Sequence, residues 1–350
     1  MRSSFIFVVI VTVSSVAFVA GDGLPALVYP SPLTQSPPEL DGFLDDACWT
    51  DAPAASSFTV YRKPGRLAEA QTSFRVVYDR NNIYFGVSCD EPFAKGLDPS
   101  SVPHDSYDIF SQGSIEIFID PEHSHSVYYQ FVSNLAGSIF DARRSQRTWD
   151  NRTRVGRPVG KDNWTVEMAI PLRNLGVKRP AGGMVVGFNV CCSRFRGGGH
   201  LSYWSYAPGF HYPGHFAHLV LSPTETMLRK KEGEFRKGER KGPIRIFNKV
   251  GYSNKTYVAL AREALAELDR MIGELRAASR SENSERIKAE IETHLAAIEN
   301  TIAFHRDKLV GEGPLDPARR ASLDVQLQKA KARIPTLLWD ARIAASLAEI

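Results

Sequence analysis

The stretch SIEIFIDPEHSHSVYYQFVSNLAGSIFD, residues 114–141, decides the fold of the larger part of this chain. Isoleucine occupies every second position of residues 115–119, and this period of two predicts a β-strand with one apolar face. Residues 121–126 are rich in His and Ser and lack large apolar side chains, which indicates a hairpin loop. A second strand over 128–133 and a third over 138–142 follow. We therefore expect three consecutive antiparallel strands with one dry face and one polar face.

Three polar side chains stand on the polar face of this predicted sheet or at its rim: Glu116, Gln130 and Asn134. They lie among aromatic residues, and acids or amides beside aromatic rings are the groups that bind a polar ligand such as a sugar. We interpret this face as a candidate platform for a polar ligand. Asn134, followed by Gly137, is equally an ordinary turn signal.

The sequence on both sides of this stretch continues as short strands. Apolar or aromatic runs recur about every ten residues between residues 40 and 222, and no helix longer than two turns is predicted there. This spacing is typical of a β-sandwich rather than of alternating strands and helices. We expect an antiparallel β-sandwich over about residues 38–222, preceded by an extended lead-in over 22–37.

The N-terminal residues predict export. Arg2 is followed by an apolar run over residues 5–20 and by Gly21. This arrangement is typical of a secretory signal peptide. A membrane anchor is the alternative, although sixteen residues with three hydroxyl side chains are short for a span. We expect a signal peptide over residues 1–21, an exported chain (periplasmic, cell-surface or extracellular), and no membrane span after cleavage.

The cysteines and histidines indicate no metal or redox motif. The spacing of Cys48, Cys89, Cys191 and Cys192 matches no zinc or haem pattern. A disulfide between distant strands forms readily in an oxidising compartment, and buried free thiols are the equally weighted alternative.

Catalytic motifs are also missing from the sequence. A glycosidase needs two carboxylates that face each other across the scissile bond, and no second acid is paired with Glu116. The sequence contains no serine nucleophile elbow, no HExxH and no phosphate loop. His211, His215 and His218 have helical spacing, but the Pro-Gly pair between the first two argues against a helix and hence against a metal site. We expect a protein that is not itself an enzyme.

Seven blocks of sequence resemble the family 9 carbohydrate-binding modules. In order along residues 38–222 they are ELDGFLDDACW, VVYDRNNIYFGVSCDE, SIEIFIDPE, YYQFVSNLAGSIFD, NWTVEMAIPLRNLG, GFNVCCSR and YWSYAPGFHYPGHFAHLVL. The resemblance implies a β-sandwich with a sugar-binding cleft on one side, in a secreted protein of polysaccharide catabolism that is often joined to xylanases or other O-glycosyl hydrolases. It also implies a structural calcium ion held by carboxylates and carbonyls, with ligands that the sequence does not identify.

The resemblance further implies which residues would bind the sugar. In the family two tryptophans sandwich a terminal sugar; Trp204 matches the second, and Phe110 stands where the first is expected. Phe can stack on a sugar ring but offers less surface and no N–H. Glu116 matches an acid that the family uses on sugar hydroxyls, and its alternative role is a structural pair with Arg194.

Four further residues complete the candidate saccharide site. Gln130 and Asn134 fall in the strand where the family has an Arg, Asn, Gln series, and no Arg is present in this strand. Arg194 ends an apolar strand, where a pair with a carboxylate is the alternative to ligand contact. Trp149 lies in a basic loop and is a candidate extra stacking surface, with core packing as its alternative.

A basic segment follows the predicted sandwich. Between Arg229 and Lys249 nine Lys or Arg and three Glu give a local charge of +6, although the whole chain carries only +4. We interpret residues 223–255 as a charged linker, either a solvated tether or a contact to an acidic polymer or membrane surface. The basic character is confined to this segment, so we do not expect nucleic-acid binding.

Helical periodicity begins at residue 256. Leucine and isoleucine recur at helical spacing over residues 260–275, 287–309 and 323–338, which predicts three amphipathic helices with a coiled-coil-like seam. We expect a helical hairpin or a three-helix bundle over 256–350. We interpret it as a spacer or as an element of self-association.

The sequence therefore predicts non-catalytic carbohydrate binding by an exported sandwich, directed at a polysaccharide or its chain end. An interaction or assembly protein with a degenerate sandwich is the first alternative. An accessory part of a glycoside hydrolase system is the second.

Overall fold

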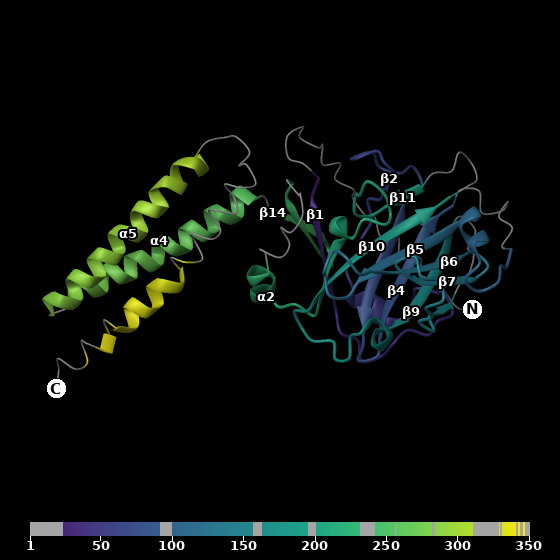
Figure 1. The fold of residues 1–350 in the computed structure, drawn as a ribbon, viewed down its shortest axis with the longest axis horizontal. Coiled ribbons are helices and arrows are strands. Elements are labelled where there is room, and N and C mark those ends of the chain that lie inside the picture. The colour runs from purple at the N-terminus through teal and green to yellow at the C-terminus, as the bar shows by residue number, and fades with distance from the viewer. Residues whose placement is uncertain are drawn as a thin grey trace, which may run out of the picture.

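A β-sandwich followed by helices makes up the part of the chain that the computed structural model describes (Figure 1). The described residues are 24–91, 100–156, 163–194, 201–231, 242–255, 257–281, 284–310, 329, 331–340, 342–343 and 346. Two sheets pack against each other across one apolar core. The predicted fold class, a sandwich and then packed helices, is confirmed.

The larger sheet has ten strands. Its main path runs β14-β13-β1-β12-β10-β5-β6-β7, and β11 pairs with both β10 and β2. The strands are β1 Ala26–Ser31, β2 Thr59–Val60, β5 Ser114–Asp120, β6 Tyr129–Asn134, β7 Ile139–Arg143, β10 Val185–Ser193, β11 Leu201–Tyr203, β12 Ala217–Leu221, β13 Ile244–Asn248 and β14 Gly251–Lys255. Its pairs are antiparallel except at β1, which runs parallel to β12 and β13.

The smaller sheet has four antiparallel strands in the order β3-β4-β9-β8. They are β3 Thr72–Tyr78, β4 Asn82–Asp90, β8 Arg154–Gly156 and β9 Asn163–Pro171. Short helical elements connect the strands: α1 Ala47–Asp51, η2 Tyr107–Ser111, η3 Leu172–Leu175, η4 Pro213–His215 and α2 Glu225–Lys230. Trp49 of α1 is buried, and its indole Nε1 donates a hydrogen bond of 2.9 Å to Glu167 Oε1 of β9.

The meander predicted from residues 114–141 is present as β5, β6 and β7. Ile117 stands opposite Phe131, and both side chains belong to the core between the sheets. Glu116 and Gln130 point to the other face, together with Ala142 opposite Gln130. The alternation in sequence therefore divides the strands into an inner and an outer face, as expected from a period of two.

Two segments that we expected outside the sandwich are strands of its larger sheet. The lead-in over 22–37 contains β1, and the basic linker over 223–255 contains β13 and β14. Tyr29 explains why β1 is retained: it is fully buried, its hydroxyl donates to Pro53 O at 2.6 Å and it accepts from Val76 N at 2.8 Å. Domain limits of 38 and 222 are therefore too narrow for the sandwich, which extends from β1 to β14.

The C-terminal helices pack on one another as predicted. Helix α4 covers Tyr257–Ser281 and helix α5 covers Glu285–Val310, and residues 331–340 form a third helix. Leu268 and Leu275 of α4 are fully buried, in one apolar cluster with Ile291 of α5 and Ile334 of the third helix. In Figure 1 the helices lie beside the sandwich, beyond the β14 edge of the larger sheet.

Three further expectations concern the signal peptide, a membrane span and the cysteines. The predicted signal peptide, residues 1–21, lies outside the described residues. In the part of the chain that is described, each helix is too short or too polar to cross a bilayer. The thiols of Cys48, Cys89, Cys191 and Cys192 are buried and unbridged.

Candidate functional site

A hollow of about 630 Å³ lies on the outer face of the larger sheet, over β6 and β7. Gln130 of β6 and its partner Ala142 of β7 form its floor together with Phe140. Helix η2 and the segment before η4 contribute its sides. The lining residues are Tyr107, Phe110, Ser126, Tyr128, Gln130, Phe140, Ala142, Arg144, Ser145, His211 and Pro213.

Three aromatic rings form one side of the hollow. The ring centroids of Phe110 and Phe140 are 5.0 Å apart and nearly edge to face, and those of Tyr107 and Phe140 are 5.7 Å apart. Ile109 and Val132 pack under Phe110 and Phe140 in one apolar cluster, so the rings are held in place by core contacts. Tyr107 is 60% exposed and offers its ring to a ligand.

Tyr128 and His211 contribute a polar pair to the lining. Tyr128 Oη and His211 Nδ1 are 2.9 Å apart, and the imidazole also meets the ring of Phe118 edge to face at 5.2 Å between centroids. Burial lowers the pKa of His211, so its imidazole is neutral at neutral pH. A neutral imidazole has one donor and one acceptor nitrogen, which suits it to hydroxyl groups.

Glu116 lies behind the floor of the hollow rather than in it. Its side chain is 4% exposed, Gln130 Nε2 donates to its Oε2 at 2.8 Å, and Ser193 Oγ lies 3.4 Å from its Oε1. Burial raises the pKa of Glu116 to about 7, an effect that the hydrogen bonds from Gln130 and Ser193 oppose. Glu116 therefore orients the amide of Gln130, which is itself 3% exposed and is one of several polar residues that line the hollow.

Arg144 is held in a strained backbone conformation beside the hollow. Its φ is +56°, in the left-handed region that non-glycine residues rarely adopt. Its guanidinium donates from Nε and Nη2 to Ser126 O at 2.9 and 2.8 Å. The side chain is therefore anchored to the hairpin between β5 and β6, with its charge in the lining of the hollow.

The structure corrects the expectation for Trp204. Its side chain is 3% exposed and packs in the core against Phe74, with ring centroids 4.9 Å apart, and against Phe188 at 5.2 Å. Its Nε1 donates to Ser56 O at 3.2 Å. Because it belongs to the core between the sheets, neither face of its ring can stack on a sugar.

Arg194 is likewise part of the interior. It is 7% exposed and forms a two-pronged ion pair with Glu91, at 3.2 Å from Nε to Oε2 and 3.0 Å from Nη2 to Oε1. Its proposed contact with a ligand is therefore corrected to the structural alternative, a pair with a carboxylate, and that carboxylate is Glu91 rather than Glu116.

Asn134 and Trp149 also have structural roles. Asn134 is fully buried, donates to Ser100 O and Gln112 Oε1 at 3.2 and 2.6 Å, and accepts from Ser138 N at 2.9 Å, which closes the turn before β7. Trp149 packs on Tyr129, with ring centroids 4.6 Å apart, and is partly buried against the inner apolar core. Neither residue lines the hollow.

Nine of the eleven lining residues were missed in the sequence, and five of them carry an aromatic ring or a charge: Tyr107, Tyr128, Phe140, Arg144 and His211. Tyr128 could have been found, since it has the same parity as Gln130 and so faces outward. Phe140 alternates with Asp141 and Arg143, so the polar alternation of its strand does not place it on the outer face. Tyr107, Arg144 and His211 come from loops that meet only in the fold, and no local pattern in the sequence marks them.

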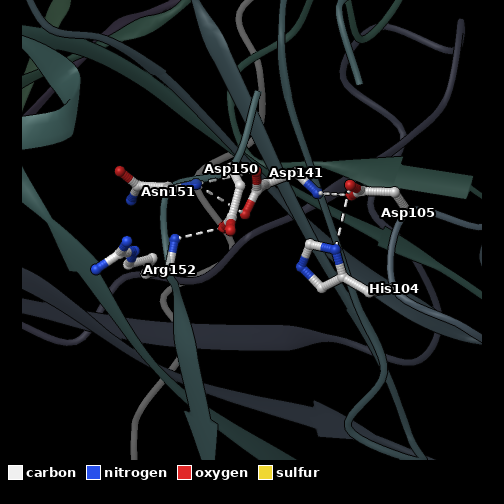
Figure 2. A network of polar contacts seen from close by, with 6 residues as sticks. All are labelled: His104, Asp105, Asp141, Asp150, Asn151 and Arg152. Atoms are coloured by element: carbon white, nitrogen blue, oxygen red, sulfur yellow. Dashed lines mark hydrogen bonds and ion pairs between the residues drawn. The ribbon is translucent and has the colours of Figure 1, made fainter. Parts of the chain in front are cut away.

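A group that could hold a metal ion lies on the other side of β7. One ligand atom each from His104, Asp141 and Asp150 come within 4.8 Å of one another (Figure 2). Asp141 is buried and accepts from Asn151 N at 3.2 Å, and its own amide donates to Asp105 Oδ1 at 3.1 Å. Burial raises the pKa of Asp141 to about 7, reinforced by the charges of Asp105 and Asp150.

This donor set can be tested against the metal that the resemblance implies. Two carboxylates suit calcium, which takes oxygen ligands, whereas the imidazole of His104 is a better ligand for zinc or manganese. His104 Nδ1 already lies 3.1 Å from Asp105 Oδ2, an ion pair when the imidazole is protonated. The group therefore fits a divalent cation in general.

Comparison with known proteins identifies the first part of the chain. Residues 40–201 match the family described as carbohydrate family 9 binding domain-like. No curated protein matches the chain.

Solved structures with a similar arrangement include a carbohydrate-binding module of family 9 from Caldicellulosiruptor kristjanssonii. Its complex with glucose has a TM-score of 0.42 and 17% sequence identity, over 56% of this chain and 97% of that one. Its complex with cellotriose has a TM-score of 0.42 and 16% identity, over 57% and 95%. A protein from Bacteroides uniformis has a TM-score of 0.46 and 15% identity, over 56% and 99%.

Proposed function

Starting from the family 9-like domain over residues 40–201, we propose that this chain binds a saccharide, without catalysis, in the hollow over β6 and β7. The observation that carries the proposal is the combination of aromatic rings and hydrogen-bonding groups in one concave lining. Tyr107 and Phe110 supply the accessible rings, which pack on the buried Phe140, while Gln130 and the other polar lining residues supply donors and acceptors.

This combination matches the chemistry of a pyranose ring. A sugar presents apolar C–H groups on its faces and hydroxyls around its edge, so that a flat aromatic ring covers the face while amide, hydroxyl and imidazole groups bind the edge. Gln130 is oriented by Glu116, and Tyr128 by its contact with His211. The lining contains no carboxylate, whereas hydrolysis of a glycoside needs two, so binding alone is the function that these residues support.

Calorimetric titration of the full chain tests this proposal. Glucose and cellotriose are the first probes, because a family 9 module has been solved with each of them, and a wider glycan array follows. We expect saturable binding of at least one saccharide, which Phe110→Ala weakens. If no saccharide binds to the folded chain, the proposal is wrong.

We also propose that the chain is exported and acts in polysaccharide catabolism by holding its partners on a polysaccharide or its chain end. The apolar run over residues 5–20 supports export. Sequencing the N-terminus of the protein recovered outside the cytoplasm tests it, and an intact N-terminus on a chain confined to the cytoplasm would contradict it.

We propose a divalent cation, with calcium as the first candidate, at the group of His104, Asp141 and Asp150. The crowding of Asp141 with Asp105 and Asp150 supports it, because a cation offsets the repulsion among these carboxylates. We expect calcium, manganese or zinc to raise the Tm of the chain, and Asp141→Asn to abolish the shift. An unchanged Tm with all three ions would contradict the site.

A second candidate function is an interaction or assembly role for the helices. Trp339 of the third helix and Ile343, which follows that helix in the sequence, are 64% and 43% exposed. The burial of Trp204 also favours this alternative, because one of the two stacking positions implied by the family resemblance is lost. If the helices mediate assembly, the mass measured for the protein in solution should rise with its concentration.

A further inference from the structure

We infer that the preferred ligand of the hollow over β6 and β7 is an anionic saccharide, a pyranose that carries a carboxylate or a sulfate group. This inference rests on the proposed saccharide binding and deepens it by naming the class of sugar. Three observations carry it: the positive charge of the lining, the fixed guanidinium of Arg144 with N–H groups that have no partner among the described residues, and the position of Arg147 beside Tyr107.

The charge of the lining is entirely positive. Arg144 is the one permanently charged residue among the eleven that line the hollow, and none of them is Asp or Glu. A site for a neutral sugar gains from carboxylates, which accept hydrogen bonds from several hydroxyls at once. A lining with a guanidinium and without a carboxylate instead complements an anion.

Glu116, the acid that is hydrogen-bonded to the lining residue Gln130, is withdrawn from the hollow. Glu116 is 4% exposed and lies behind Gln130, which donates to it. Burial also raises the pKa of Glu116 to about 7, so a substantial fraction of this carboxyl group is protonated at neutral pH. Repulsion of a bound anion by Glu116 is reduced on both counts.

Arg144 is positioned in advance and keeps part of its hydrogen-bonding capacity. A guanidinium has five N–H donors, and here Nε and Nη2 each give one to Ser126 O. The three other N–H groups, on Nη1 and Nη2, have no partner among the described residues. These N–H groups can donate two parallel hydrogen bonds to a carboxylate or sulfate.

The backbone of Arg144 supports the same inference. Its φ of +56° is unfavourable for a residue with a Cβ, and glycine would avoid this strain. Strain of this kind is retained where the surrounding structure uses the side chain it positions. Ser126 holds the guanidinium in place, so the strained residue delivers a fixed positive charge to the hollow.

A second arginine extends the positive region to the aromatic side. The guanidinium carbon of Arg147 lies 5.2 Å from the centroid of the Tyr107 ring. A ligand that stacks on Tyr107 therefore also approaches Arg147. Arg144 and Arg147 together would attract an anionic sugar from solution, an effect that salt screens.

Matched pairs of sugars test the inference on the full chain. Each pair has the same ring stereochemistry and differs only at C6: the methyl glycosides of glucose and glucuronic acid, of galactose and galacturonic acid, and of mannose and mannuronic acid. Glucose 6-sulfate and galactose 6-sulfate form a second arm that separates sulfate from carboxylate as the anion. Affinities are measured by calorimetry at neutral pH, in low and in high NaCl.

We expect the anionic member of at least one pair to bind about tenfold tighter or more than its neutral partner in low salt, the gain of a charge-assisted hydrogen bond. High salt should reduce this preference. Arg144→Gln should remove this preference, and an unchanged Tm of the variant shows that the fold is intact. Arg173→Gln, an exposed arginine of η3, is the control that loses one charge elsewhere.

The outcomes separate this inference from the proposed function. Neutral sugars that bind as tightly as the anionic ones overturn the anionic preference and leave saccharide binding in place. A preference that survives Arg144→Gln also overturns it, because the charge then acts elsewhere. If no sugar of either kind binds, saccharide binding itself is wrong and the anionic preference falls with it.

Discussion

At the scale of single residues, burial changes what the polar groups can do. Glu116 has the chemistry of a sugar-binding acid, but the fold encloses it and leaves Gln130 as the group in contact with the hollow. Trp204 has the chemistry of a stacking platform, but its side chain is buried in the core. The side chain that lines a site is decided by which face of the strand carries it and by what covers that face.

The first prediction at this scale is that Glu116→Gln changes how stability depends on pH. The folded pKa of Glu116 is about 7, above the ordinary value, so the folded chain retains a proton that the unfolded chain has lost. Stability from this residue is therefore greatest below about pH 4.5 and falls as pH rises towards 7. Relative to wild type, Glu116→Gln should gain stability over this window, at most on the order of 3 kcal/mol.

Calorimetric unfolding of both proteins between about pH 4 and pH 8 measures this difference. Glu167→Gln is a useful comparison, because burial also raises the pKa of Glu167 to about 7. If the Tm of Glu116→Gln and that of wild type change in parallel across the range, Glu116 is ionised in the fold and our account of it is wrong.

The second prediction contrasts two aromatic residues. Trp204→Ala should lower the free energy of unfolding by about 3–5 kcal/mol, because it removes a fully packed side chain from the core. Phe110→Ala should cost much less stability, since Phe110 is only half-buried, and should instead weaken saccharide binding. Urea unfolding gives the first quantity and calorimetric titration the second. A stable Trp204→Ala variant that has specifically lost binding would reverse our assignment.

At the scale of elements, the edges of the larger sheet depend on strands that are distant in the sequence. Strand β1 lies between β12 and β13 and is parallel to both, so each of its pairings closes a loop of about two hundred residues. Tyr29 of β1 also hydrogen-bonds to Pro53 and Val76, which lie outside the larger sheet. Such contacts make β1 part of the sandwich rather than an appendage.

The third prediction follows for fragments. A fragment of residues 24–255 should unfold cooperatively, whereas a fragment of residues 38–222 should be strongly destabilised or fail to fold. Removing β1 exposes β12 and deletes the fully buried ring of Tyr29, at a cost of about 3–5 kcal/mol for the ring alone. Circular dichroism with thermal melting measures both fragments. Equal melting temperatures would show that β1, β13 and β14 contribute nothing.

These elements also show how far the sequence could be read. Period-two alternation predicted the meander of β5 to β7 and its two faces, because that signal is local. The roles of β1 and β13 were not predicted. A proline within β1 and the charge before β13 suggested loops, and the strands that β1 pairs with lie far along the chain. Trp204 was placed on the wrong side because it follows the three-residue strand β11, where alternation is too short to define a face.

At the scale of the whole molecule, the sandwich is joined to a separate helical unit. The three helices bury one another's apolar residues, with Leu268, Leu275 and Ile334 fully covered. We therefore predict that the chain is a monomer, because the main apolar stripes already have partners within it. Sedimentation equilibrium measures the mass, and a mass that increases with concentration would contradict this prediction and favour an assembly role.

The central claim, that the hollow over β6 and β7 is where a saccharide binds, is tested most directly by hydrogen–deuterium exchange with and without a saturating saccharide. We predict that protection gained on binding is confined to the segments that line the hollow, residues 107–111, 126–130, 140–145 and 211–213. The turn around Trp149 and the exposed rim of the smaller sheet should exchange unchanged. Protection centred on those regions, with the hollow unaffected, would contradict the account.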